Sequence, residues 1–211
     1  MMVCRERFPE GWMTFYLNCP AWSFVLSAGL CGEQAVAGVT IPSVDRVGRY
    51  FNFTMASILP AEISPAVFAG TNGDWLANLE NLALSVLEEE MDQDGIEDAI
   101  NQSSAELTWN PVAHTTYSNT PEHEKVMCDG SAGVRELLPE LLHGRITSEN
   151  PQYGLWWHHG SSQVNAQLVS CVNMPSADIY LGLMVNEDTI SSDEGPSQPP
   201  EVDYLDELLA D

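Results

Sequence analysis

Four carboxylates between residues 90 and 98 have the spacing that best fits a chemical site. In the run Glu90-Met91-Asp92-Gln93-Asp94-Gly95, oxygen-bearing side chains recur at alternate positions and a glycine stands sixth, as at the start of a calcium-binding loop. The twelfth position holds Asn101 instead of the glutamate that completes such a loop. We therefore predict no full calcium hand. We predict no cofactor other than weakly bound calcium, held by a carboxylate cluster of Glu90, Asp92, Asp94 and Asp98.

The sequence contains no convincing nucleophile–base constellation. Tyr117-Ser118-Asn119 and the later His158-His159-Gly160-Ser161 look like two short motifs of serine β-lactamases, but the Ser-x-x-Lys nucleophile motif is missing and Lys125 is the only lysine. His158 and His159 are neighbours on a predicted strand, so they point to opposite faces and do not share one metal. We expect one of them to be buried and the other exposed. The sequence thus predicts a protein that is not an enzyme.

The charge of the chain is strongly acidic and unevenly distributed. The net charge is −24 over 211 residues, yet residues 1–60 hold four acids and four bases, whereas residues 61–211 hold 27 acids and three bases. Such a surface repels phosphates, so we expect no direct nucleic-acid binding by the folded domain. Basic proteins or cations are the expected partners. Residues 11–32 carry no charge, but Asn18, Pro20 and several serines interrupt them, and we expect no membrane contact.

Alternating apolar and polar residues predict a chain made mainly of β-strands. Asp74 is a suitable N-cap for an amphipathic helix, and Pro139 is expected to kink a later helix. Residues 117–130 are predicted to form a loop. The predicted strands are Trp12–Leu17, Ala21–Ala28, Ala35–Ile41, Tyr50–Ile58, Leu107–His114, Tyr153–His158, Val164–Val172 and Asp178–Val185. The predicted helices are Trp75–Met91, Ile96–Gln102 and Val134–His143.

Eight strands in two groups of four, with helices between the groups, predict an all-β fold. The expected architecture is an eight-stranded antiparallel jelly-roll β-sandwich with one long and one or two short helices between the strands. We predict a single domain over residues 1–185, with the helical insertion at about 75–103. Residues 186–211 are rich in Pro, Ser and acidic residues and are predicted to form a mobile tail.

Three stretches resemble the coat proteins of nodavirus-like small RNA viruses, in the same order along the chain. The first is Thr14-Phe15-Tyr16-Leu17 with Pro20. The second is Arg49-Tyr50, Pro60, Phe68-Ala69-Gly70 and Trp75. The third is the closing strand pair ending at Val185, followed by a polar tail that contains Pro199, Pro200, Asp203 and Leu208. The resemblance implies a jelly-roll shell protein that associates with copies of itself. The basic N-terminal arm that packs RNA in such coats has no counterpart here.

Two functional hypotheses follow for this chain. The first is a non-enzymatic viral coat protein that self-assembles into a shell, located in the virion or the host cytoplasm, with cations screening the acidic surfaces. The alternative is an acidic decoy or inhibitor that imitates nucleic acid and binds a basic nucleic-acid-binding protein.

Overall fold

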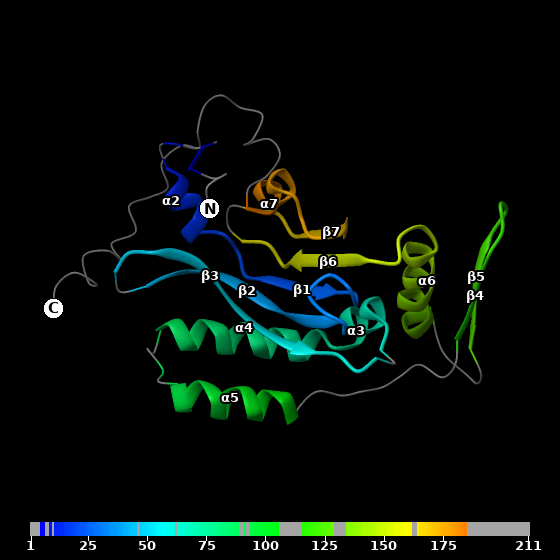
Figure 1. The fold of residues 1–211 in the computed structure, drawn as a ribbon, viewed down its shortest axis with the longest axis horizontal. Coiled ribbons are helices and arrows are strands. Elements are labelled where there is room, and N and C mark those ends of the chain that lie inside the picture. Colours follow the sequence, from blue (N-terminus) through cyan, green and yellow to red (C-terminus); the bar gives the residue numbers. More distant parts are fainter. Residues whose placement is uncertain are drawn as a thin grey trace.

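A five-stranded antiparallel sheet forms the centre of the protein (Figure 1). Its strand order is β3-β2-β1-β6-β7, so β1 pairs with β2 on one side and with β6 on the other. The strands are β1 (Trp22–Leu26), β2 (Val36–Val44), β3 (Tyr50–Ile58), β6 (Tyr153–His158) and β7 (Gln167–Val172). The computed structural model describes residues 5–6, 9, 11–45, 47–61, 63–88, 91, 93–105, 115–128, 134–161 and 164–184.

Helices lie on both faces of this sheet, and a separate hairpin projects at one end beside α6 (Figure 1). The helices are α2 (Trp12–Leu17), α3 (Pro65–Thr71), α4 (Gly73–Glu88), α5 (Gln93–Ala105), α6 (Val134–Glu149) and α7 (Ala177–Met184). The hairpin consists of β4 (Thr115–Asn119) and β5 (Glu124–Cys128). Within the described residues, no helix is long and apolar enough to cross a bilayer.

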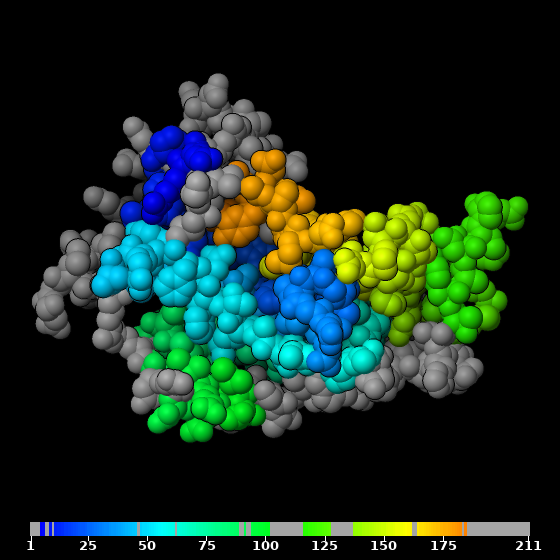
Figure 2. Space-filling view, viewed as in Figure 1, coloured from blue at the N-terminus to red at the C-terminus, as the bar shows by residue number. Residues whose placement is uncertain are grey.

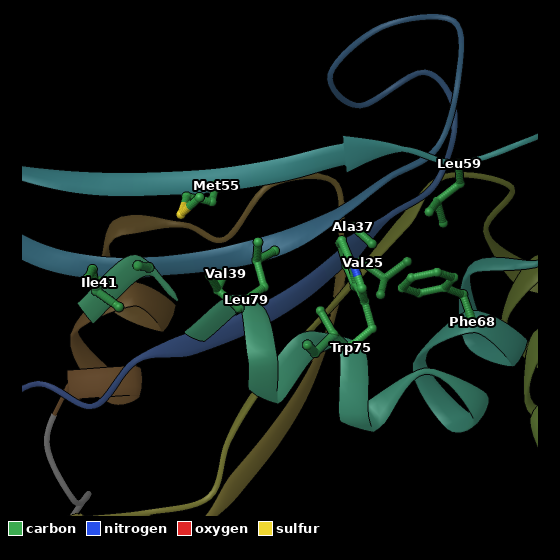
Figure 3. Close-up of a cluster of buried hydrophobic side chains, with 11 residues drawn as sticks. Val25, Ala37, Val39, Ile41, Met55, Leu59, Phe68, Trp75 and Leu79 are labelled. Carbon is green, nitrogen blue, oxygen red and sulfur yellow. The ribbon is translucent and has the colours of Figure 1, made fainter. Parts of the chain in front are cut away.

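The main core lies between the sheet and the helices α3 and α4 (Figure 3). Val25, Val39 and Met55 come from three neighbouring strands, and they pack against Phe68 of α3 and Trp75 of α4. Ser64 is the N-cap of helix α3: its Oγ accepts a hydrogen bond from Val67 N–H, and Pro65 occupies the first turn. The burial of these side chains fixes one face of the sheet.

The opposite face of the sheet is covered in part by α2 and α7. Phe15 and Tyr16 of α2 pack with Leu181 and Met184 of α7 in a second, smaller core. The Tyr16 hydroxyl reaches the sheet itself: it accepts a hydrogen bond from Ser43 N–H (3.1 Å) and donates one to the Phe51 carbonyl (2.5 Å). Since Ser43 and Phe51 are opposite each other in β2 and β3, Tyr16 bridges the two strands where their pairing ends.

The all-β jelly-roll prediction is wrong, because the protein has a mixed α and β structure with one main sheet. Trp12–Leu17 and Asp178–Val185 were predicted to be strands, but residues 12–17 and 177–184 are helices. Their buried residues follow a helical period: Trp12, Phe15 and Tyr16 share one stripe, and Tyr180, Leu181 and Met184 share another. The predicted loop at 117–130 contains most of the β4–β5 hairpin.

Five of the predicted strands and all three predicted helices are confirmed, with shifted ends. The strands predicted at Ala21–Ala28, Ala35–Ile41, Tyr50–Ile58, Tyr153–His158 and Val164–Val172 are β1, β2, β3, β6 and β7. Pro139 lies inside α6, which still begins at Val134. The strand predicted at Leu107–His114 and the tail 186–211 lie outside the described residues. The proposed domain boundary therefore stays a prediction.

Removing the Tyr16 hydroxyl tests the link between α2 and the sheet. In the Tyr16→Phe variant, the buried Ser43 N–H loses its acceptor, so we expect the free energy of unfolding to fall by about 1–3 kcal/mol. Urea unfolding followed by circular dichroism measures this change. The matched control is Tyr180→Phe, whose hydroxyl bonds only the exposed Asn52 side chain among its described hydrogen bonds. An equal loss in both variants would contradict the bridging role of Tyr16.

Candidate functional site

An apolar cavity of about 720 Å³ lies on the side of the sheet away from α4. Its floor is formed by alternate residues of the strands, among them Trp22, Phe24, Thr54 and Trp156. Its other wall is the segment from Met174 through the first turn of α7. The volume falls within the range of about 300–1,000 Å³ that is usual for ligand pockets.

The cavity lining is uncharged, although the protein has a net charge of −24. None of the described residues that line it is Asp, Glu, Lys, Arg or His. The Nε1 atoms of Trp22 and Trp156 are buried and have no hydrogen-bond partner among the described residues. A buried N–H without an acceptor costs free energy. The lining of the cavity is therefore suited to an apolar group.

Polar side chains at one end of the cavity hold its walls together. Asn52 of β3 and Tyr180 of α7 share a hydrogen bond, with 2.9 Å between Asn52 Nδ2 and the Tyr180 hydroxyl oxygen. The hydroxyls of Thr40 and Thr54 are 2.9 Å apart across β2 and β3. The Asn52–Tyr180 bond links α7 to β3 across the cavity, whereas the Thr40–Thr54 contact lies within the sheet.

A buried tyrosine on the other face of the sheet joins α3, α6 and β6. Tyr153 is 1% exposed, and its hydroxyl accepts a hydrogen bond from Ala66 N–H (3.3 Å). The same hydroxyl lies 2.8 Å from His143 Nδ1, and donating its proton to a neutral His143 satisfies both groups. Burial raises the pKa of Tyr153, with the nearby charge of Glu140 adding to this, and burial lowers the pKa of His143.

His158 is also a structural residue. It is buried, and its Nδ1 accepts a hydrogen bond from Gly160 N–H (2.8 Å). Its ring packs edge-on against Trp22, with ring centres 4.2 Å apart. Burial, together with the neighbouring His159, lowers the pKa of His158. His159 is exposed, so the prediction of one buried and one exposed histidine is confirmed.

The carboxylates predicted to bind a cation are only partly within the described residues. Asp94 and Asp98 are exposed on α5, while Glu90 and Asp92 lie outside the residues that the structure describes. Among the described side chains, no group of three or more His, Cys, Asp or Glu could hold a metal ion. The carboxylate cluster and its calcium therefore stay a prediction. The Tyr117-Ser118-Asn119 motif is on β4 and His158 on β6, in different sheets.

No local sequence pattern predicts the cavity residues. The alternation of Trp22, Phe24 and Leu26 indicates a strand and nothing more. Val25 on the other face of β1 is equally apolar, and this was an available signal that both faces of the strand are covered. Trp156 joins the same surface only because β6 pairs with β1, placing it opposite Phe24.

Comparison with known proteins places the chain near a bacterial secretion family. Residues 1–103 match the model of the TagF N-terminal domain, described as type VI secretion system-associated. This region contains β1–β3, α2–α4 and most of α5, and it supplies most of the cavity lining. The crystal structure of PA0076 from Pseudomonas aeruginosa PAO1 is similar: the two chains are 28% identical, with a TM-score of 0.65 over 94% of this chain and 83% of the other. No curated protein matches the chain.

These comparisons overturn the viral interpretation. The matching family model and the similar crystal structure are both bacterial in context, and nothing in them points to a nodavirus coat protein. The predictions of a shell protein and of a location in a virion are wrong. The fold gives the physical reason, since segments taken for the first and last shell strands are the helices α2 and α7.

Protonation of His143 gives a test of the buried tyrosine junction. The pKa of His143 is lowered in the folded protein, so the unfolded chain binds more protons near and below pH 6.5. The free energy of unfolding must therefore fall as the pH drops from about 6.5 through the folded pKa. We expect His143→Gln, which keeps an acceptor for Tyr153, to reduce this pH dependence. Urea unfolding between pH 7 and 5 measures it. His123→Gln in the exposed hairpin turn is the control, and an equal effect of both substitutions would contradict the assignment.

Proposed function

We propose that this protein is associated with a bacterial type VI secretion system and regulates it by binding another protein, without catalysing a reaction. The observation that carries the proposal is the match of residues 1–103 to the TagF N-terminal domain. The similarity to PA0076 covers 94% of this chain, so the likeness to a bacterial protein extends beyond residues 1–103.

The character of the cavity favours binding over catalysis. General acid–base chemistry needs a titratable group within reach of the substrate. The described lining of the cavity contains no Asp, Glu, Lys, Arg or His, and its ionisable groups are the thiols of Cys19 and Cys31 and the phenols of Tyr16 and Tyr180. The half-buried His143 and the buried His158 are each engaged in packing and in a hydrogen bond within the fold.

The same features define the group that the cavity would receive. Trp22, Phe24 and Trp156 provide large apolar surfaces, and such aromatic residues dominate the energy of many protein interfaces. An aromatic or aliphatic side chain of a partner has the chemistry that this lining would receive. Self-association, basic partners and weak calcium binding are further proposals from the sequence.

Deletion of the gene in its bacterium tests the proposed function. We expect the deletion to change the release of a type VI substrate several-fold, because a regulator alters the amount of secretion. Immunoblotting of culture supernatants, with and without a plasmid copy of the gene, measures the effect. Unchanged release under both low-secretion and high-secretion conditions would count against any role in this system.

A substitution that fills the cavity tests whether the cavity itself is needed for the function of the protein. Ala177, at the start of α7, lines the cavity, and an indole at this position would occupy part of it. We expect an Ala177→Trp copy to fail to complement the deletion, since its partner group can no longer enter. Ala77→Trp on the exposed face of α4 is the matched control. Both variants should unfold at similar temperatures, and full complementation by both would exclude the cavity as the binding site.

A further inference from the structure

The strand β7 forms one edge of the main sheet, and no described strand pairs with the backbone groups on its outer side. The backbone N–H and C=O groups of Tyr153 point towards β1, since its carbonyl accepts a hydrogen bond from Ser27 N–H (2.9 Å). Backbone groups alternate in direction along a strand, so those of Gly154 and Trp156 point to β7, where they face Cys171 and Val169. The N–H and C=O groups of the alternate β7 residues therefore point away from the sheet; these residues are Leu168, Ser170 and Val172.

The side chains of these three residues are exposed on the helix-covered face of the sheet. They lie opposite Trp157, Leu155 and Tyr153 of β6, which belong to that face. Leu168 is 65% exposed and Val172 is 53% exposed. An apolar edge strand with free hydrogen-bonding groups is a site at which another strand can be added.

An apolar groove of about 500 Å³ adjoins this edge. Leu168 of β7 forms one border, and Leu138 and Leu142, one turn apart on α6, form another. Leu138 is 59% exposed and Leu142 is 40% exposed, although both are large and apolar. Figure 2 shows β7 and α7 at the surface next to the α6 region. The floor of the groove contains Trp157 of β6.

We propose that an extended, basic segment of a partner protein adds to the edge of β7 as a sixth strand and places alternate apolar side chains in this groove. Strand addition satisfies the outward backbone groups of Leu168, Ser170 and Val172, and the groove receives the side chains on the helix-covered face. The proposal deepens the proposed function, because it describes how a partner in the secretion system would be held.

The charge of the chain determines the type of partner. The elements around the groove, α3, α6, β6 and β7, themselves hold three acids and two bases, whereas the whole chain has a net charge of −24. A second copy of this chain would bring the same negative charge to the interface, and residues 185–211 contain no lysine or arginine. A segment with alternating apolar and basic residues complements both the groove and the field around it.

The other edge strand, β3, is less suited to this role. On the face of the sheet away from α4, the side chain of Asn52 is hydrogen-bonded to Tyr180 of α7. Tyr50, at the start of the strand, packs with Trp12 and Tyr16 of α2. An incoming strand at β3 would meet these elements, whereas the described residues leave the helix-side surface of β7 open.

Hydrogen exchange with a model peptide tests the proposal directly. The probe is the synthetic peptide Val-Lys-Leu-Lys-Val-Lys-Leu-Lys, added to the full chain, and the control peptide carries Glu in place of Lys. We expect the amides of Leu168, Ser170 and Val172 to exchange at least tenfold more slowly with the lysine peptide, because they become hydrogen-bonded. The amides of Val169 and Cys171, which already face β6, should change little. Protection confined to other segments, or equal binding of both peptides, would overturn the proposal.

Two proline variants distinguish strand addition from general attraction between a cationic peptide and an acidic protein. Ser170→Pro removes one outward N–H and no bond of the sheet, as edge strands tolerate. We expect it to weaken peptide binding at least tenfold in fluorescence anisotropy, whereas Ile58→Pro at the β3 edge leaves binding within twofold. Equal binding by both variants and the unmodified chain would show only nonspecific attraction and would refute the proposal.

Removing apolar side chains from the groove gives an independent measurement. Leu168→Ser and Leu142→Ser should each weaken peptide binding several-fold while leaving the melting temperature nearly unchanged, because both side chains are already exposed. Sedimentation of the chain alone tests the other occupants: a concentration-dependent dimer that Leu168→Ser abolishes would assign the edge to a second copy and reject the basic segment. A negative peptide result together with a deletion phenotype would reject this site and leave the proposed function standing.

Discussion

The burial of both faces of β1 is the constraint on which the rest of the structure depends. Trp22, Phe24 and Leu26 point to one side and Val25 to the other, and all are at most 5% exposed. Each aromatic side chain buries about 150–250 Å², worth about 4–6 kcal/mol at 25 cal/mol per Å². A single helical layer would leave one of these faces in water. The helices α2 and α7 and the segment before α7 are therefore part of the core architecture, and the apolar cavity is the portion of the second face that they do not fill.

The strands of the main sheet could be predicted because alternation holds over most of their length. The errors concern short segments. In the six residues of α2 and the eight of α7, an apolar stripe of period 3.6 contains only three or four members, and some of these also alternate. Ile179, Leu181 and Leu183 suggested a strand, whereas Tyr180, Leu181 and Met184 form the packed stripe. Ser176 was an overlooked capping signal, since its Oγ accepts a hydrogen bond from Ile179 N–H.

The candidate site depends on pairings that sequence periodicity does not contain. Nothing in the first sixty residues indicates that β6 lies next to β1, yet this pairing brings Trp156 beside Phe24, with ring centres 5.0 Å apart. The carboxylates between Glu90 and Asp98 predict a cation site because their spacing is local in the sequence. A cavity whose walls come from residues 16–56 and 156–180 has no local spacing to detect. The uneven charge distribution does not mark a structural boundary, since β6 and β7 of the acidic half share one sheet with β1–β3.

The strand β6 connects the two surfaces that this structure offers to partners. Its residues alternate between them: Trp156 lines the cavity, while Leu155 and Trp157 line the groove beside β7. The described linings of both surfaces contain no Asp, Glu, Lys or Arg, although the protein is strongly acidic. Apolar linings avoid the desolvation cost that a carboxylate would add, whereas exposed acids act at a distance on the approach and orientation of a basic partner. The aromatic and aliphatic residues around β6 therefore provide the affinity for a partner, and the acidic surface of the protein selects for a basic one.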